Sequence, residues 1–161
     1  MAAWWQGKKG EYWVLGQGLV LAGFFLVPPI NGVIPSNSRQ YLLAGAVLLA
    51  LVAVFFLIGG LWHLGRNLTP LPHPKDAGTL VTTGVYGLVR HPIYSGVICL
   101  CGAYGLVAGS IVHGVGTVGV GLFFVAKAGQ EERWLREKFA EYAEYQASVG
   151  QLLPRLFRRS H

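Results

Sequence analysis

Three short segments of the sequence combine residue types that can bind or act on a small molecule, and each adjoins a long apolar block. They are the stretch 78–86, the segment Arg90-His91-Pro92-Ile93-Tyr94-Ser95-Gly96, and the pair Glu131-Glu132. Proline is well tolerated in the first turn of a helix, so Pro92 predicts that a helix begins directly after Arg90 and His91. The free N–H groups and positive dipole at such a helix start suit an anionic group, for example a carboxylate.

Each of these residues also has a plainer explanation when it is taken alone. Arg90 could anchor a helix at a membrane surface, His91 could be a hydrogen-bonded loop residue, and Glu131 could simply balance a nearby cation. Tyr86 and Tyr94 offer ring faces and hydroxyls to a ligand, but tyrosines also gather at membrane–water interfaces. The residue types alone leave these alternatives open.

Long apolar blocks must position these segments. The chain is 53% hydrophobic and only 12% charged, whereas soluble domains carry about 25% charged residues. Blocks 12–34 and 41–61 exceed the roughly 20 residues that a helix needs to cross a bilayer. Blocks 93–108 and 111–126 are shorter and predict a tight helical hairpin. We therefore expect an all-α integral membrane protein with about four transmembrane helices, the first of them kinked near Pro28-Pro29.

The distribution of Lys and Arg predicts an orientation in the membrane. With the N-terminus inside, twelve of the 13 basic residues fall on the cytoplasmic side and only Arg39 falls outside. This bias follows the positive-inside rule and predicts that both termini are cytoplasmic. Basic loops beside anionic headgroups also account for the net charge of +6, so we expect the lipid bilayer and no nucleic acid as a partner.

Two cytoplasmic segments surround the candidate residues. The loop 62–90 contains three alternating prolines, which favour extended backbone, and a loop of this length in a small protein is usually functional or disordered. Residues 130–149 predict one amphipathic helix. On its helical wheel Glu131 lies in the middle of the apolar stripe and needs a partner. Glu132 lies at the edge of the stripe, where water should reach it.

The remaining cysteines and histidines do not predict a metal site. Cys99 and Cys101 are two positions apart in an apolar block, so they point to different helix faces and should act as packing residues. His63, His73 and His113 show no ligand spacing with any cysteine or carboxylate. We therefore expect no bound metal.

Taken together, the motifs resemble those of the isoprenylcysteine carboxyl methyltransferase family, whose wider group includes bacterial relatives and phospholipid methyltransferases. The resemblance covers residues 64–154. It rests on LVTTGVYGLVRHPIYSG (80–96), Glu131-Glu132, F-A-E-Y-A-E-Y (139–145) and Leu152-Leu153-Pro154. It implies S-adenosylmethionine as the cofactor, bound at the cytoplasmic ends of the last membrane helices, and we expect a bacterial inner membrane. Within a single domain, 1–161, residues 1–62 would form scaffold spans and residues 63–154 the cofactor-binding half.

The resemblance also implies roles for individual residues. The expected catalytic residues are His91 and Arg90, and Lys127 is expected to bind the substrate. The expected cofactor contacts are Gly78, Thr79, Leu80, Val81, Tyr86, His91, Pro92, Ile93, Tyr94 and Glu131.

Two departures from the family pattern concern the substrate side. Lys127 replaces an arginine that contacts the substrate in the prenylcysteine enzymes, and a lysine lacks the planar fork that binds a carboxylate through two hydrogen bonds. Ser148-Val149-Gly150 replaces the usual Arg-Val-Pro near the C-terminus. The cofactor half of the pattern is therefore kept, whereas the substrate half is altered.

The sequence thus predicts an S-adenosylmethionine-dependent methyltransferase that acts on a lipophilic or small membrane-permeant acceptor. A carboxylate or thiolate acceptor needs no general base, whereas an amine needs a proton acceptor, for which His91 is nearest. One alternative is an NADPH-dependent membrane reductase of the sterol-reductase-like group, although its phosphates would call for more basic residues in the loop 62–90. The other alternative is a non-catalytic membrane scaffold.

Overall fold

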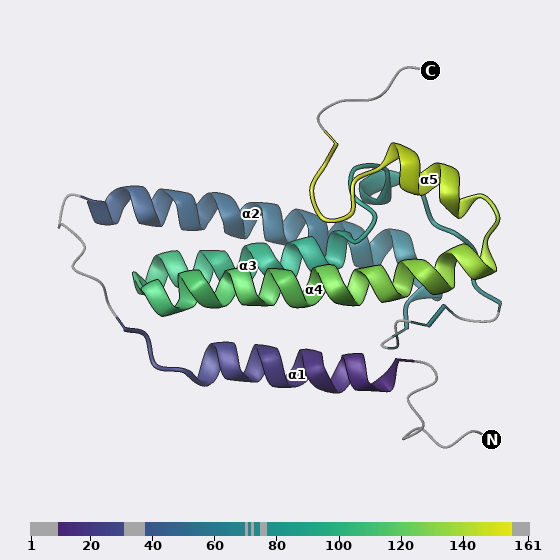
Figure 1. Cartoon of the computed structure of the whole chain (residues 1–161). Helices are drawn as coiled ribbons and strands as arrows, with labels where there is room; N and C mark the ends of the chain where they lie inside the picture. The colour runs from purple at the N-terminus through teal and green to yellow at the C-terminus, as the bar shows by residue number, and fades with distance from the viewer. Residues whose placement is uncertain (1–9, 31–37, 70, 72, 75–76, 156–161) are drawn as a thin grey trace.

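The computed structural model describes residues 10–30, 38–69, 71, 73–74 and 77–155, and within these ranges the chain is helical without a β-strand. Four long helices lie side by side, and a short fifth helix lies at one end of them (Figure 1). The helices are α1 (Glu11–Leu26), α2 (Arg39–Leu64), α3 (Pro92–Ala108), α4 (Ile111–Lys138) and α5 (Tyr142–Ser148), with two 3₁₀ turns, η3 (Gly65–Asn67) and η4 (Gly84–Gly87).

The hairpin predicted between residues 108 and 111 is confirmed, but its second helix is not short: α4 has 28 residues and continues well beyond the predicted block 111–126. Helix α3 ends at Gly109, whose φ of 59° lies in the left-handed region that favours glycine. The N–H of Ser110 donates to the carbonyl of Gly105 at 3.1 Å, which satisfies one of the last carbonyls of the helix. Helix α4 begins at the next residue. Pro92 occupies the first turn of α3, as predicted.

The first apolar block ends its helix earlier than predicted. Helix α1 stops at Leu26, and Val27 is already extended, so Pro28-Pro29 follow the helix rather than kink it. The cause is local, because a proline restricts the residue before it to extended conformations. The rest of that block, from residue 31, lies outside the described residues, as do the prolines at positions 70 and 72.

The prediction of one amphipathic helix over residues 130–149 is wrong. Helix α4 runs without interruption from Ile111 to Lys138, and Phe139 then adopts extended backbone before α5 begins at Tyr142. No glycine or proline causes this break. Instead, α5 turns back toward the loop before α3, where Tyr142 and Tyr145 are buried. Tertiary contacts of these two tyrosines outweigh the continuity of the helical pattern.

Helices α2 and α3 pack closely because small residues line their contact. A methyl group added at Gly60 would come within 2.8 Å of the side chain of Ile93, and one at Gly96 would come within 2.7 Å of Leu57. Glycine at both positions lets the start of α3 lie directly on α2. Nearby, Val85 and Val89 pack with Phe56 of α2 in an apolar cluster, so the loop before α3 is fixed to the bundle.

The apolar surface of the bundle is typical of an integral membrane protein. Two helical stretches, Arg39–Asn67 and Ile111–Lys138, are long and apolar enough to cross a membrane, yet only 17% and 28% of their most apolar windows are buried. A helix that is apolar all round in a water-soluble protein would be mostly buried. Helices α1 and α3 are also apolar but have 16 and 17 residues, or about 24–26 Å against ~30 Å of hydrocarbon.

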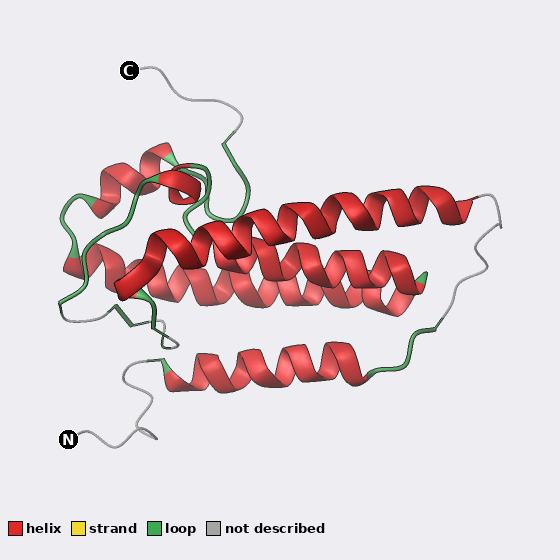
Figure 2. Cartoon of the chain, turned by 180° about the vertical axis from the view of Figure 1, so that it is seen from behind, coloured by secondary structure: helices red, strands yellow, loops and turns green. Residues whose placement is uncertain are grey.

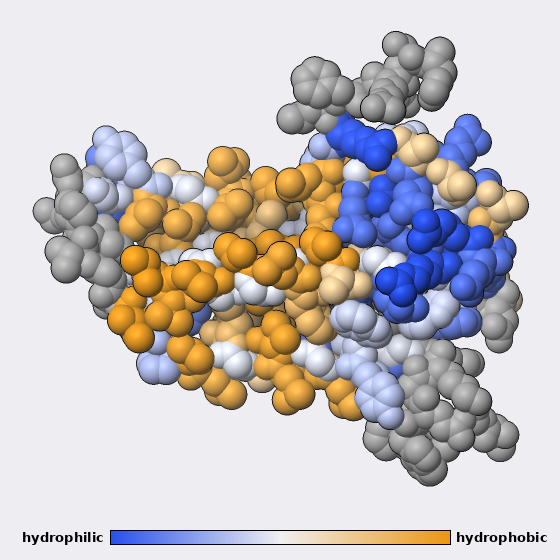
Figure 3. Space-filling view, viewed as in Figure 1, coloured by the Kyte–Doolittle hydropathy of each residue, from blue (hydrophilic) through white to orange (hydrophobic). Residues whose placement is uncertain are grey.

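The two ends of the bundle differ in polarity. Apolar side chains cover most of its length, and hydrophilic ones gather where α2 ends, α3 begins and α4 meets α5 (Figure 3). Seen from behind, loops fold over this same end (Figure 2). Among the described Lys and Arg residues, only Arg39 lies at the opposite end. The candidate residues from the sequence all belong to the polar half, so we next describe their arrangement there.

Candidate active site

A cavity of roughly 270 Å³ lies at the polar end of the bundle. Its walls come from the end of α2, the loop that follows it, the start of α3, the last turns of α4, and α5, and one residue, Gln17, comes from α1. The volume is close to the lower end of the ~300–1,000 Å³ range of small-molecule sites. Segments up to 128 positions apart in sequence, from Gln17 to Tyr145, therefore meet at one space.

All twelve residues predicted from the sequence as site residues line this cavity. They come from three separate segments of the chain, and their side chains or backbone face the same space. They are Gly78, Thr79, Leu80, Val81, Tyr86, Arg90, His91, Pro92, Ile93, Tyr94, Lys127 and Glu131.

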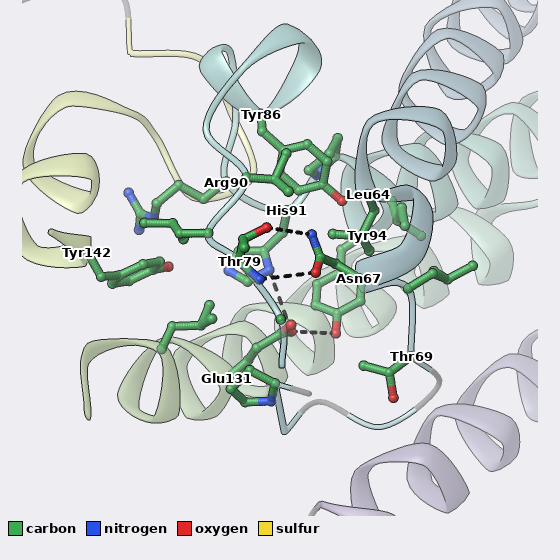
Figure 4. Close-up of a pocket in the computed structure, with 18 of the residues that line it drawn as sticks. Leu64, Asn67, Thr69, Thr79, Tyr86, Arg90, His91, Tyr94, Glu131 and Tyr142 are labelled. Atoms are coloured by element: carbon green, nitrogen blue, oxygen red, sulfur yellow. Dashed lines mark hydrogen bonds and ion pairs between the residues drawn. The ribbon is translucent and has the colours of Figure 1, made fainter. Parts of the chain in front are cut away.

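The carboxylate of Glu131 is held at the cavity wall by Tyr94 and His91. The Tyr94 hydroxyl donates to Glu131 Oε2 at 2.8 Å, and His91 Nδ1 lies 3.7 Å from the same oxygen. The rings of His91 and Tyr94 stack, with an interplanar angle of 4°. Figure 4 shows these three side chains grouped on one side of the cavity. Glu131 thus presents a fixed negative charge, and a quarter of its side chain remains exposed.

The adjacent carboxylate, Glu132, has a different environment from the one predicted. It is 3% exposed, so the expectation that water reaches it is wrong. Arg90 approaches Glu132 Oε1 through Nε at 2.9 Å and Nη2 at 2.8 Å, and His91 Nε2 lies 3.1 Å from the same oxygen. Gln146 donates to Oε2 at 2.7 Å. The helical wheel failed here because it assumed one helix up to residue 149, whereas α5 folds over the Glu132 side of α4.

Arg90 lines the cavity but directs its guanidinium toward α5. Besides Glu132, it donates to the backbone carbonyls of Gln146 and Val149, and in Figure 4 its charged end points away from the centre of the cavity. These contacts fix α5 and the segment after it against the start of α3. The geometry therefore indicates that Arg90 positions other residues, and the predicted catalytic role of Arg90 stays a prediction.

The C-terminal segment that departs from the family pattern, residues 148–150, packs beside the network of Arg90 and Glu132. Val89 and Gly150 form a parallel β-bridge, and the N–H of Arg90 donates to the Gly150 carbonyl at 2.8 Å. The Ser95 hydroxyl donates to the Leu152 carbonyl at 2.7 Å. A methyl group at Gly150 would meet the Leu153 carbonyl oxygen at 1.9 Å, so only glycine fits at this turn. The close approach of the backbone therefore explains why residue 150 is a glycine in this chain.

The loop wall of the cavity is attached to the end of α2 by a pair of hydrogen bonds. Asn67 Nδ2 donates to Thr79 Oγ1 at 3.2 Å, and the Thr79 N–H donates to Asn67 Oδ1 at 3.1 Å. Tyr86 packs in the apolar cluster on α2, and its hydroxyl lies 3.4 Å from the Gly60 carbonyl. The segment from Thr79 to Tyr86 is thereby attached to α2 and η3 at both of its ends.

Lys127 reaches the cavity from α4, one turn before Glu131. It is only 3% exposed, so it does not extend to the membrane surface as an interfacial lysine would. Its ammonium group donates to Gln17 Oε1 of α1 and lies 5.1 Å from the centre of the Tyr94 ring. This position places a cation between α1 and the Glu131 side of the cavity. Its predicted role in substrate binding is untested.

Tyr142 contributes a polar atom that has no partner among the residues that the structure describes. Its side chain is 1% exposed and lines the cavity, and its hydroxyl oxygen is buried without a hydrogen bond. In Figure 4 this hydroxyl points toward the centre of the cavity. Burial raises the pKa of Tyr142 above its usual value, as it does for Tyr86 and Tyr145. The hydroxyl is therefore protonated and can donate to a ligand.

Several lining residues were not predicted from the sequence. Tyr142 and Tyr145 lie in a stretch that was read only for its helical pattern, although the repeated tyrosines at positions 142 and 145 were part of the family motif. Asn67 and Thr69 lie in the predicted functional loop, and their polarity next to apolar residues was a usable signal. Gln17 was missed because α1 was regarded as scaffold. A single amide in an apolar helix was the only signal for it.

Comparison with known proteins agrees with this location of the site. A family model described as phospholipid methyltransferase matches residues 41–142 of the chain, which is well over half of its 161 residues. No curated protein matches the chain at a significant level. The matched range includes nearly all of α2, the loop wall of the cavity, α3 and the pair Glu131-Glu132 of α4. The membership predicted from the sequence motifs is confirmed, and the chain belongs to the phospholipid methyltransferase family.

Proposed function

We propose that the chain is an S-adenosylmethionine-dependent methyltransferase and that the cavity at the polar end of the bundle binds this cofactor. The observation that carries the proposal is that all ten residues with an expected cofactor contact line one cavity, although they come from three segments of the chain. When bound, the cofactor supplies a methyl group on a positively charged sulfur, so the acceptor needs only to be a nucleophile in line with it.

The residues of the cavity suit the charges of such a cofactor. Glu131 offers a carboxylate for its cationic groups or its ribose hydroxyls, and the ring of Tyr86, which lines the cavity, is of a type that attracts cations. The start of α3 after His91 offers unpaired N–H groups and a positive dipole for a carboxylate. The buried Tyr142 hydroxyl gains a partner when a polar ligand fills the space, which removes the cost of an unsatisfied buried group.

The acceptor is assigned to the deeper part of the cavity, beside Lys127 and Gln17. The side chains next to the Lys127 ammonium are aromatic, namely Tyr94 and Phe124, and α1 is the helix next to this position. A lipophilic molecule with a carboxylate, thiol or amine at its polar end fits this combination. The ammonium of Lys127 would orient an anionic acceptor group. For an amine, His91 is the nearest side chain that could receive the proton.

We further propose that all four long helices cross the membrane, with the cavity on the cytoplasmic side. The ends that carry the cavity also carry most of the basic residues, as the positive-inside rule requires of a cytoplasmic face. Tilting, local thinning and flanking polar residues allow helices as short as α1 and α3 to span a bilayer. In this orientation both termini are cytoplasmic, and a bacterial inner membrane is the expected location.

An NADPH-dependent reductase fits the cavity less well. Its dinucleotide carries several phosphate charges, whereas the described residues that line the cavity include two cationic side chains, Arg90 and Lys127. Both already have partners, Glu132 and Gln17. Arg90 would have to give up its contacts to Glu132 and to α5 in order to meet a phosphate. Lys127, which has further N–H donors, would then face the phosphate charges alone.

Transfer of a labelled methyl group tests the proposed activity. The purified protein, reconstituted in bilayers, would be incubated with [methyl-³H]S-adenosylmethionine and a membrane lipid extract, with heat-inactivated protein as the control. We expect label in the organic phase only with the intact protein. Thermal stabilisation by NADPH and none by S-adenosylhomocysteine would contradict the proposal and favour the reductase.

A further inference from the structure

A second polar atom without a partner lies at the opposite end of the bundle, far from the cavity. His113, in the first turn of α4, is 1% exposed, and its Nδ1 lies 2.8 Å from the hydroxyl of Ser110. Its Nε2 is buried and has no hydrogen bond within the described part of the chain. The ring packs edge-on against Phe24 and Tyr104. A buried nitrogen without a hydrogen bond destabilises the fold, so a partner for it is expected.

His113 lines an apolar groove between α1 and α4. The groove has a volume of roughly 370 Å³, and the other residues that line it are Phe24, valines and glycines, from Val20 to Val27 at α1 and from Val112 to Val120 on α4. It opens to the outside of the bundle, since Gly23, Val27 and Gly119 are exposed. In a membrane, this opening faces the lipid. Apolar side chains cover the surface along α1 and α4 in Figure 3.

Water alone fits this groove poorly. Its volume is more than ten times the ~30 Å³ that one water molecule occupies, and a buried water needs two to four polar partners. Among the described residues that line the groove, His113 is the one whose side chain has a polar atom left without a hydrogen bond, Nε2. An apolar molecule that carries one hydrogen-bonding group satisfies both features.

The pairing with Ser110 narrows the type of polar group. If His113 Nδ1 carries the proton, it donates to Ser110 Oγ and Nε2 must accept; if Ser110 donates instead, Nε2 carries the proton and must donate. A hydroxyl group can serve either form, because it both donates and accepts. We propose that the groove between α1 and α4 binds a membrane lipid alcohol, with its apolar chain along the groove and its hydroxyl on His113 Nε2.

Matched ligands and variants test this site without reference to catalysis. The full-length protein in phosphatidylcholine nanodiscs would be titrated with hexadecanol or with hexadecane, which lacks the hydroxyl, and bound ligand counted by native mass spectrometry. We expect one hexadecanol per chain and weaker binding of hexadecane. His113→Phe keeps the ring but removes the hydrogen-bonding atom. It should weaken hexadecanol binding roughly three- to tenfold, as the loss of one neutral hydrogen bond predicts.

A second variant fills the groove while leaving His113 in place. Side-chain atoms at Gly119 would meet nothing within 4 Å at the Cβ position, so Gly119→Leu should fold and exclude hexadecanol. Gly121→Leu is the matched control, since Gly121 has the same free space but does not line the groove, and it should bind normally. Equal binding of hexadecanol by the wild type, His113→Phe and Gly119→Leu would overturn the proposal. So would equal binding of hexadecane and hexadecanol by the wild type.

Discussion

The network around Glu132 and the cavity wall around Glu131 occupy adjacent faces of α4 and differ in how fully their polar atoms are paired. Glu132 is buried and contacts Arg90, His91 and Gln146. Glu131 has one hydrogen bond, from Tyr94, and a partly exposed carboxylate that faces the cavity. Two neighbouring carboxylates in the sequence thus have different surroundings, and one of them is left available to a ligand.

This difference indicates that the Glu132 network positions other residues, whereas the wall around Glu131 can bind a ligand. A buried charge needs several partners to be stable, and Glu132 has Arg90, His91 and Gln146, which connect α4 to the start of α3 and to α5. The Glu131 wall contains groups that a ligand could still satisfy, including the hydroxyl of Tyr142. Disrupting the first region should reduce stability, whereas disrupting the second should reduce ligand binding with little effect on stability.

The largest expected effect is on folding. Glu132→Ala leaves Arg90 buried without its carboxylate, and loss of one partner of a buried ion pair costs about 3–5 kcal/mol. We expect a clear fall in the thermal unfolding temperature of the detergent-solubilised protein, followed by circular dichroism. Glu137→Ala, on the exposed side of α4, is the control and should unfold like the wild type. If both variants unfold at the wild-type temperature, the Glu132 network does not stabilise the fold.

Lys127 tests the comparison between the two regions more sharply, because it lines the cavity like Glu131 and also has a partner, Gln17. Lys127→Met should leave cofactor affinity nearly unchanged but lower the turnover of an anionic acceptor about tenfold, the lower range of a lost charged hydrogen bond. Lys127→Arg keeps the charge and adds a planar fork, so it should retain activity. Steady-state kinetics with the identified acceptor would measure both. Normal turnover by Lys127→Met would mean that the acceptor is neutral or is held elsewhere.

The smallest expected effect compares two tyrosines of α5. Tyr142→Phe removes a hydroxyl that has no partner among the described residues, so it should not lower stability. It should weaken S-adenosylhomocysteine binding a few-fold, as one neutral hydrogen bond predicts. Tyr145 donates to the Tyr86 carbonyl at 2.6 Å. Tyr145→Phe should therefore lower the unfolding temperature. Calorimetry and thermal unfolding of both variants would show whether these effects separate; identical behaviour would place both hydroxyls in the same role.

Local patterns in the sequence predicted much of the fold and the cavity. Pro92 marked the start of α3, Gly109-Ser110 marked the hairpin, and the motif residues from Gly78 to Tyr94 proved to lie along one cavity. The first two features depend on backbone restrictions that act over a few residues, whereas the cavity residues were expected from the resemblance of their motifs to those of a known family. They could therefore be read directly from the chain.

The features that the sequence did not predict depend on contacts between segments that are distant in the chain. The burial of Glu132 follows from α5 folding back over α4, and no glycine or proline at residues 138–141 marks that turn. Gln17 reaches Lys127 across 110 positions. Helical periodicity describes one helix in isolation, so it could not distinguish which of two adjacent glutamates would be covered by another element.

Calorimetric titration with S-adenosylhomocysteine tests the central claim most directly, namely that Glu131 faces a cofactor site. The comparison is between the wild type, Glu131→Gln and the exposed matched control Glu137→Gln. We expect the wild type and Glu137→Gln to bind one molecule with equal affinity. Glu131→Gln should bind about tenfold or more weakly, because a hydrogen bond to a charged group contributes roughly 1.5–3 kcal/mol. Absence of binding by the wild type, or equal affinity in all three proteins, would contradict the account.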